Sequence, residues 1–337
     1  MATCKYVPVY RTIGVAVVLA VACAAATNNP PPPGQLIDIG GRKLHIHCTG
    51  DGSPTVIVEN GGAAFSFDWE LVQAEVARFT RICTYDRAGY AWSDVGPEFD
   101  TFDQASHDLH LLLTKADIHG PYVLVGHSLG GLLVRFYHAT YPRDVVGMVL
   151  ADSSHEESLQ PVGLKVVRIP ELTANEFKAL IDEGKARRPQ NPEPDLVPET
   201  IFRPYDKLPT TLQTLQLWAL RKVLPLLKNW GFGLHYDLGR LHKIRNASPH
   251  PQGNTPLAVL TASEFDVAQA PGMTPEQARQ DHLRLQNDLV QLSTNSRHVM
   301  VSGSGHEVYL YNPAIVVRSI SAVVTAVRKH SEVAPIE

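Results

Sequence analysis

Cysteine is scarce in this sequence of 337 residues: there are four, and none of their spacings matches a metal site. Basic residues form no cluster either, since 30 lysines and arginines are scattered among 34 acidic residues, for a formal net charge of −4. A protein that binds nucleic acid would show a basic stripe, so we expect no nucleic-acid partner. The absence of internal repeats excludes a solenoid or a propeller. No motif for a cofactor or a metal ion is present, and we predict neither.

The N-terminal segment has the pattern of an export signal. Basic residues precede an apolar run over residues 13–26, which ends in the small-residue pattern that signal peptidase cuts. Residues 1–26 are therefore predicted to be a signal peptide and the protein to be exported, as a secreted, periplasmic or envelope-associated protein. The run is shorter than the ~20 residues of a spanning helix, yet a membrane anchor is the alternative and would give membrane association. Lipidation at Cys23 is a weaker alternative, because the residues before it lack the usual lipobox leucine.

Residues 27–34 form a proline-rich linker, which is a stiff, extended spacer, and the folded domain is expected to begin near Gln35. Cys48 and Cys83 are the two cysteines of that domain. Both lie in predicted strands, and an oxidising compartment would permit a disulfide if those strands are neighbours. Two unpaired buried cysteines are the alternative.

Strand and helix patterns alternate through residues 35–155 and 252–337, which we predict to form one α/β core. Short apolar runs rich in β-branched residues are typical of buried strands, and apolar residues at helical spacing follow most of them. Such alternation predicts a mostly parallel sheet with helices on both faces. Strands are expected at 35–39, 43–48, 55–59, 81–85, 122–125, 145–150, 256–261 and 297–301, and helices at 69–79, 101–116, 132–141, 275–292 and 313–329.

Residues 156–251 lack this alternation. Prolines recur there, and helical fragments appear at 174–183 and 212–227. We predict that this segment is an inserted helical lid over the site. Its large apolar side chains are expected either to line an acyl pocket or to form the core of the lid itself; they include Trp218, Trp230, Phe232 and Tyr236.

One serine stands where a predicted strand turns into a helix, in the segment Gly126-His127-Ser128-Leu129-Gly130. This G-x-S-x-G pattern is typical of a nucleophile elbow, whose glycines leave room for the neighbouring strand and helix. The turn exposes the Ser128 hydroxyl. It also directs a helix N-terminus at the place where a tetrahedral oxyanion would form, with the Leu129 N–H as one donor. An ordinary surface serine on a glycine-rich turn is the alternative.

A serine hydroxyl needs a base to become a good nucleophile, and the base needs a third group to orient it. His306 is predicted to be the base, because it lies in a glycine-flanked loop after the last predicted strand and before the last helix. Two aspartates compete for the third role. Asp266 follows its strand by a few residues and is preferred, while Asp152 follows its strand directly. Glu264 ranks behind both.

The segment Asn60-Gly61-Gly62 follows another predicted strand. A glycine pair lets the backbone approach a ligand closely, so the Gly62 N–H is predicted to be the second oxyanion donor. A plain turn is the alternative.

The chain resembles the α/β-hydrolase fold serine hydrolases of the lidded, esterase-like type. Four segments carry the resemblance, in family order: Asn60-Gly61-Gly62, Tyr85-Asp86-Arg87-Ala88-Gly89-Tyr90, the elbow around Ser128, and Gly305-His306. It covers about residues 35–329 apart from the predicted lid, and it implies an eight-stranded, mostly parallel sheet. Asn60 departs from the family pattern, which usually has a histidine at this position.

The resemblance also bears on two assignments that the residues alone leave open. Ser263-Glu264-Phe265-Asp266 is similar to the family's G-E-x-D segment, with serine for the glycine, which favours Asp266 as the acid. The family's strand order would place the strands of Cys48 and Cys83 side by side, which implies a disulfide between them.

These residues together predict a serine hydrolase that cleaves ester-like bonds of a small-molecule or acyl substrate through an acyl-enzyme. Serine at the elbow argues against the dehalogenase and epoxide hydrolase branches of the fold, which use a carboxylate nucleophile. Hydrolysis of a thioester, lactone, amide or carbon–carbon bond and acyl transfer are alternatives. So is a catalytically silent protein that binds a ligand on the same fold.

Overall fold

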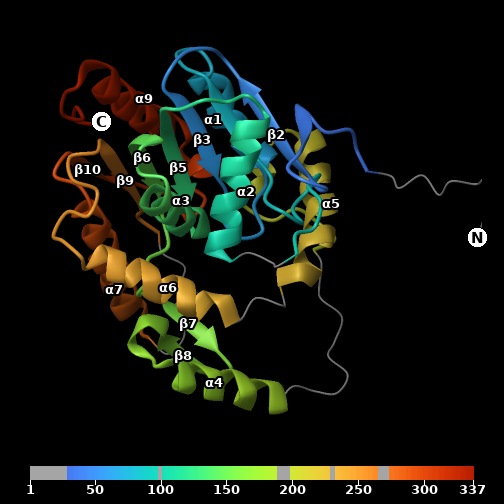
Figure 1. Ribbon diagram of the computed structural model, residues 1–337, viewed down its shortest axis with the longest axis vertical. Coiled ribbons are helices and arrows are strands. Elements are labelled where there is room, and N and C mark those ends of the chain that lie inside the picture. Colours follow the sequence, from blue (N-terminus) through green and yellow to red (C-terminus); the bar gives the residue numbers. More distant parts are fainter. Residues whose placement is uncertain (1–28, 98–100, 188–197, 228–231, 265–272) are drawn as a thin grey trace, which may run out of the picture. The chain divides into compact units, whose positions relative to one another are not determined.

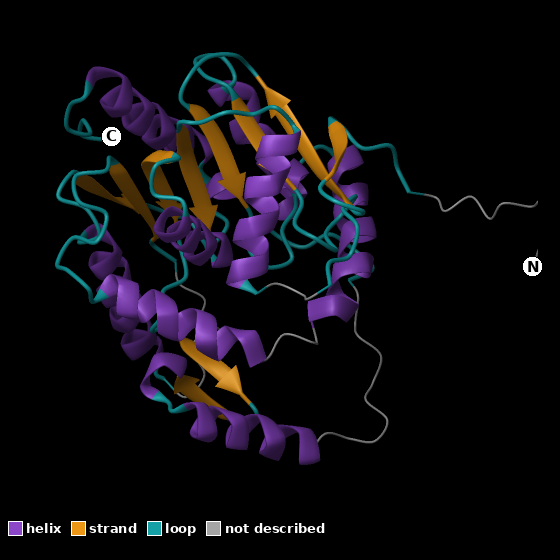
Figure 2. Cartoon of the chain, in the orientation of Figure 1, coloured by secondary structure: helices purple, strands orange, loops and turns teal. Residues whose placement is uncertain are grey.

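A central sheet of eight strands organises the part of the chain that the structure describes, which is residues 29–97, 101–187, 198–227, 232–264 and 273–337 of a computed structural model. Its order is β1-β2-β4-β3-β5-β6-β9-β10 (Figures 1 and 2). β2 pairs antiparallel with β1 and β4, and every other pair is parallel. The strands are β1 Gln35–Asp38, β2 Lys43–Thr49, β3 Thr55–Glu59, β4 Ile82–Tyr85, β5 Tyr122–His127, β6 Val145–Ala151, β9 Leu257–Ala262 and β10 Ser296–Val301.

Helices cover both faces of this sheet, as the alternating sequence pattern predicted. Val56 and Val58 of β3 pack with α1 and α9, whereas Ile57 between them packs on the opposite face with α2 and α3. This alternation of side chains along one buried strand gives the sheet two apolar cores. The helices are α1 Glu70–Val76, α2 Phe102–Lys115, α3 Leu129–Thr140, α7 Pro275–Val290, α8 Val308–Tyr311 and α9 Pro313–Lys329. The predicted α/β-hydrolase fold is confirmed.

The described part of the segment between β6 and β9 holds three α-helices, α4 Ala174–Ala186, α5 Thr210–Leu227 and α6 Phe232–Arg245. It also holds an antiparallel hairpin, β7 Leu159–Val162 with β8 Lys165–Arg168, which the sequence analysis did not predict. The hairpin turns at Gly163, whose φ of +61° suits glycine. Pro161 within β7 weakens the strand pattern there, because proline cannot donate a hydrogen bond to a neighbouring strand.

Two of these helices pack against different parts of the core domain. α5 packs Ala219, Leu220 and Val223 against an aromatic cluster from the loops after β3 and β4; its members are Phe65, Phe67, Tyr90 and Trp92. α6 instead packs Leu238 and Leu241 against α2 and α3. Trp218 lies against Trp92, at 5.4 Å between ring centroids, whereas Tyr236 is exposed. Trp230 and the side chain of Phe232 lie outside the described residues.

No helix in the described ranges is long and apolar enough to cross a membrane. The segment 1–28, on which the expected export signal depends, is not among those ranges.

Cys48 of β2 and Cys83 of β4 stand directly opposite each other and are joined by a disulfide. The bridge closes a loop of 35 residues that contains β3 and α1. A cross-link of this kind restricts the unfolded chain.

Replacing both cysteines by alanine is expected to lower the free energy of unfolding by about 4 kcal/mol, from the loop-closure entropy. Urea unfolding of the unreduced proteins measures this difference. The wild type in excess reductant is the control, and it should unfold at nearly the same urea concentration as the double variant. Equal stability of oxidised wild type and double variant would contradict the prediction.

Candidate active site

Ser128 forms the turn between β5 and α3, with φ +52° and ψ −123°. The two glycines of the motif allow this turn because other backbone atoms lie against them. A Cβ on Gly130 would come within 2.2 Å of the Glu59 carbonyl oxygen, and one on Gly126 within 2.6 Å of the Gly130 carbonyl oxygen. The predicted elbow geometry is therefore present at Ser128.

Positive φ angles at non-glycine residues gather at this site. Within the described ranges six such residues occur, and three of them are Ala63 (+55°), Ser128 (+52°) and Asp152 (+43°). These three stand after β3, β5 and β6, at the carboxyl ends of neighbouring strands. Strained backbone of this kind persists where the surrounding structure holds it, and it clusters at functional sites.

His306 lies in the loop between β10 and α8, and its Nδ1 contacts the Asp152 carboxylate at 2.7 Å. Because Oδ2 of Asp152 can only accept when ionised, Nδ1 carries the hydrogen. The lone pair on Nε2 is then the basic position of the neutral ring. Residues 152 and 306, which are far apart in the sequence, thus form a histidine–carboxylate pair of the kind that can activate a serine.

Asp152 is held from three sides. Besides His306, its carboxylate accepts a hydrogen bond from the Ala262 backbone N–H at 2.9 Å and from Nε2 of His282 at 3.1 Å. Burial by itself would raise the pKa of this carboxyl, but the hydrogen bonds from His282 and His306 outweigh burial and hold its pKa well below the usual value. The group is therefore ionised at neutral pH.

His127, next to the nucleophile position, brings the base loop onto the elbow. Its Nε2–H donates to the His306 carbonyl at 2.9 Å, and the two imidazole rings lie 4.6 Å apart between centroids. Burial lowers the pKa of His127 to about 3, with a contribution from His306, so this ring is neutral at working pH. His127 thus serves as an uncharged link between the two loops.

The loop after β6 also contacts the elbow. The Ser154 N–H donates to the Ser128 carbonyl at 3.0 Å. Gly131, in the first turn of α3, lies so close to Ser153 that an added Cβ would meet its Oγ at 1.8 Å. The two residues that follow Asp152 thus both contact the elbow, and they position Asp152 relative to Ser128.

The glycine pair predicted to hold the oxyanion lies on the elbow as well. A Cβ on Gly61 would come within 2.8 Å of Nδ1 of His127 and 3.3 Å of Cβ of Ser128, so no side chain fits there. An added Cβ on Gly62 would meet nothing within 4 Å. Leu129 begins α3, where the first N–H groups of a helix have no acceptor within it. Gly61, the neighbour of Gly62, therefore lies directly against Ser128, and Leu129 follows Ser128 in the chain.

The structure pairs His306 with Asp152 and places the loops of both against the elbow that carries Ser128. Asp266 lies outside the described residues. Glu264 is exposed, and its backbone N–H bonds to the Ser304 carbonyl. His282, which reaches Asp152 from α7, was not predicted from the sequence. It is one of fifteen histidines and has no flanking motif that would single it out.

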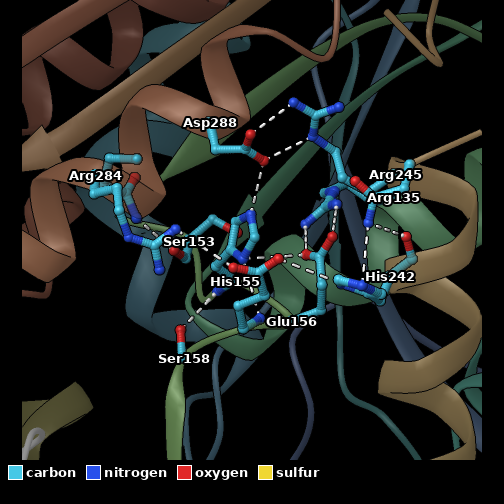
Figure 3. A network of polar contacts seen from close by, with 12 residues as sticks. Arg135, Ser153, His155, Glu156, Ser158, His242, Arg245, Arg284 and Asp288 are labelled. Atoms are coloured by element: carbon cyan, nitrogen blue, oxygen red, sulfur yellow. Dashed lines mark hydrogen bonds and ion pairs between the residues drawn. The ribbon is translucent and has the colours of Figure 1, made fainter. Parts of the chain in front are cut away.

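A second polar network adjoins the acid loop (Figure 3). Arg135 of α3 donates two hydrogen bonds to Glu156, both side chains being buried. His155, the neighbour of Glu156, bonds to Asp288 of α7, which also accepts two hydrogen bonds from Arg245 of α6. The network therefore joins α3, α6 and α7 to the chain that follows Asp152.

The Arg135–Glu156 pair gives a pH-dependent contribution to stability. Burial would raise the pKa of Glu156, but Arg135 outweighs it and lowers this pKa to about 2. The Glu156 carboxyl then binds its proton more tightly in the unfolded chain than in the folded one. The contribution of the pair to the free energy of unfolding is therefore complete above the unfolded-state pKa, and it decreases as the pH falls toward 2. Between about pH 5 and pH 2 the wild type should lose about 3 kcal/mol more than Glu156→Gln. Urea unfolding across this range measures it, and parallel curves would contradict it.

A mostly parallel sheet whose central strand ends at a glycine-flanked serine turn, with a histidine and an aspartate on neighbouring loops, is the architecture of an α/β hydrolase. The sequence agrees with this class. The chain belongs to the alpha/beta hydrolase family, which it matches over residues 44–319.

Sequence relatives extend the comparison. The chain is 25% identical over 288 residues to an AB hydrolase superfamily protein of Gibberella zeae, covering 82% of this chain and 87% of that protein. It is 21% identical over 291 residues to the uncharacterized protein YbdG of Bacillus subtilis, covering 83% and 82% respectively. A shorter match, 36% identical over 129 residues, spans 36% of this chain and only 18% of the probable transporter efuK of Hormonema carpetanum.

Solved structures share the fold. An esterase from Thermogutta terrifontis superposes with a TM-score of 0.56 at 19% identity, covering 85% of this chain and 94% of the esterase. An enol-lactonase from Burkholderia xenovorans LB400 gives a TM-score of 0.55 at 15% identity, with 86% and 100% covered. At these identities the likeness concerns the fold.

Proposed function

We propose that this protein is an exported serine hydrolase of carboxylic ester-like bonds, with Ser128 as nucleophile, His306 as base and Asp152 as the orienting acid. The observation that carries the proposal is the 2.7 Å contact of His306 Nδ1 with Asp152, beside a serine at a strained elbow. That contact gives the imidazole the tautomer whose Nε2 can accept a proton.

In the first half-reaction Nε2 of His306 takes the Ser128 hydroxyl proton as Oγ attacks the carbonyl carbon. The carbonyl π pair moves onto oxygen, and the N–H groups of Leu129 and Gly62 stabilise the oxyanion. The tetrahedral intermediate then expels the alkoxide, which receives the proton from His306 and leaves as an alcohol. Water deprotonated by His306 attacks the acyl-enzyme and releases the acid by the same steps.

The segment between β6 and β9 is proposed to act as a lid that binds the acyl group. The supporting observation is that α5 packs against the aromatic cluster of the loop that carries Gly62. Trp218 and Trp92 in that contact offer apolar surface near the oxyanion loop. Lys222 of α5 donates to the Ala91 carbonyl and ties the helix to the loop after β4.

Export is proposed from the N-terminal pattern, and the Cys48–Cys83 bridge supports it. Disulfides persist in oxidising compartments and are rare in reducing ones.

A fluorophosphonate probe tests the proposal, because it labels a serine that a base has activated. We expect labelling of the folded protein and turnover of one or more substrates in a panel of acyl esters of increasing length, with a lactone and a thioester included. A folded protein that takes no label and cleaves no member of the panel would instead be a ligand-binding protein.

A further inference from the structure

The two glycines of the oxyanion loop, Asn60-Gly61-Gly62, have no side chains that could hold them, and a buried arginine holds the loop backbone instead. Arg87, in the loop after β4, is only 3% exposed. Its Nη1 donates to the Asn60 carbonyl at 2.6 Å and to Oε1 of Glu59 at 2.7 Å, and its Nη2 donates to the Gly61 carbonyl at 2.8 Å. Two successive carbonyls of the oxyanion loop thus point at one guanidinium.

These two bonds fix the direction of two N–H groups. In a trans peptide the C=O and N–H point in opposite directions, and the peptides of this loop are trans. The Asn60 carbonyl shares its peptide with the Gly61 N–H, and the Gly61 carbonyl shares its peptide with the Gly62 N–H. Holding both carbonyls on Arg87 therefore turns the N–H groups of Gly61 and Gly62 away from it.

We propose that Arg87 is a positioning residue, which orients the Gly62 N–H as an oxyanion donor; the inference rests on the proposed function. Glycine rotates about φ and ψ more freely than any other residue, so consecutive glycines would otherwise lose this orientation. The planar guanidinium fork reaches two carbonyls and a carboxylate at once, which a lysine ammonium cannot do with the same geometry.

Arg87 acts on the loop by orienting it and not through its charge, because Glu59 balances that charge. Glu59, at the end of β3 and 2% exposed, accepts from Arg87 through one oxygen and from the Tyr85 hydroxyl through the other. The Asn60 side-chain amide donates to the Tyr85 carbonyl at 2.8 Å and holds the loop at its start. A paired, buried cation contributes orientation to the site and little net field.

The test compares two buried arginines. Arg135, at 4% exposure, also bonds to a buried glutamate, Glu156, but its hydrogen bonds go to that carboxylate and to no carbonyl of the oxyanion loop. Arg135→Met therefore controls for the loss of a buried ion pair as such. Arg87→Met and Arg135→Met are first shown to unfold cooperatively on heating. Ester hydrolysis is then measured at a temperature below both unfolding transitions.

Arg87→Met should lower kcat about 10²-fold with little change in KM, because an oxyanion donor acts in the transition state. The affinity for a trifluoromethyl ketone, whose serine adduct carries an oxyanion, should fall by a similar factor. Arg135→Met should keep kcat and ketone affinity within about threefold of the wild type, since it changes stability only.

Arg87→Lys is the second variant, which tests the same role if Arg87→Met does not fold. It keeps a cation beside Glu59 and loses the fork, and kcat should still fall at least about tenfold at similar KM. A kcat and ketone affinity equal to those of Arg135→Met would overturn the positioning role while leaving the proposed function intact. A wild type that hydrolyses no ester and takes no phosphonate would instead reject the proposed function, and this inference with it.

Discussion

Ser128→Ala is expected to lower kcat for ester hydrolysis by roughly 10⁵- to 10⁶-fold and to abolish labelling by a fluorophosphonate. Alanine removes the oxygen that would bond to the acyl carbon, while the elbow backbone and the oxyanion donors stay in place. The residual rate, about 10³-fold above that of the uncatalysed reaction in water, would come from those donors and from substrate binding. Steady-state kinetics on an ester that the wild type cleaves measures the loss.

Ser319→Ala provides a matched control. Ser319 is a fully buried serine of α9 whose hydroxyl donates to the Ile315 carbonyl of its own helix, on a face of the sheet away from the elbow. Its replacement should leave turnover and labelling unchanged. If Ser128→Ala kept more than about a hundredth of the wild-type kcat, another nucleophile would have to carry the reaction.

Asp152→Asn is expected to lower kcat about 10⁴-fold, because a neutral amide neither fixes the Nδ1–H tautomer of His306 nor stabilises the imidazolium that forms during the reaction. Asp266→Asn should leave kcat within a few-fold of the wild type. Both changes are nearly isosteric, so kinetics on the two folded variants separates the two acids.

The stability of Asp152→Asn needs its own measurement, since the carboxylate also accepts from Ala262 and His282. His282→Leu removes one of these donors without changing His306, and it should lower kcat much less than Asp152→Asn. The reverse ranking of the two aspartates, with Asp266→Asn the more severe, would make Asp266 the acid and leave Asp152 as a support for the loop.

The parts of the fold and of the site that could be predicted are those that depend on residues close together in the sequence. The strand at 122–125 and the elbow at Ser128 follow from a short apolar run and from glycines at fixed offsets, and the structure has both. His306 could be singled out among fifteen histidines because its loop follows the last strand, and the structure places it in the contact with Asp152.

The rest depends on contacts between residues far apart in the chain. Asp152 and Asp266 each follow a strand, so their spacing along the sequence does not tell which one reaches the base. His282 stands 130 residues from Asp152, and its role depends on how α7 packs. Arg87 lies in one of the segments that carry the family resemblance, but the carbonyls it holds could be known only once β3 and β4 are adjacent in the sheet.

The large insertion between β6 and β9 can vary in length and sequence with little effect on the core sheet. β6 and β9 are parallel, hydrogen-bonded neighbours, so the roughly one hundred residues between them form one crossover connection that leaves at the carboxyl end of β6 and returns at the start of β9. Because each doubling of a loop costs only about 0.6 kcal/mol in closure entropy, evolution can lengthen, shorten or exchange this segment at little expense to the core. Transplanting the corresponding segment of a relative onto the same two strands is therefore a practical route to new selectivity.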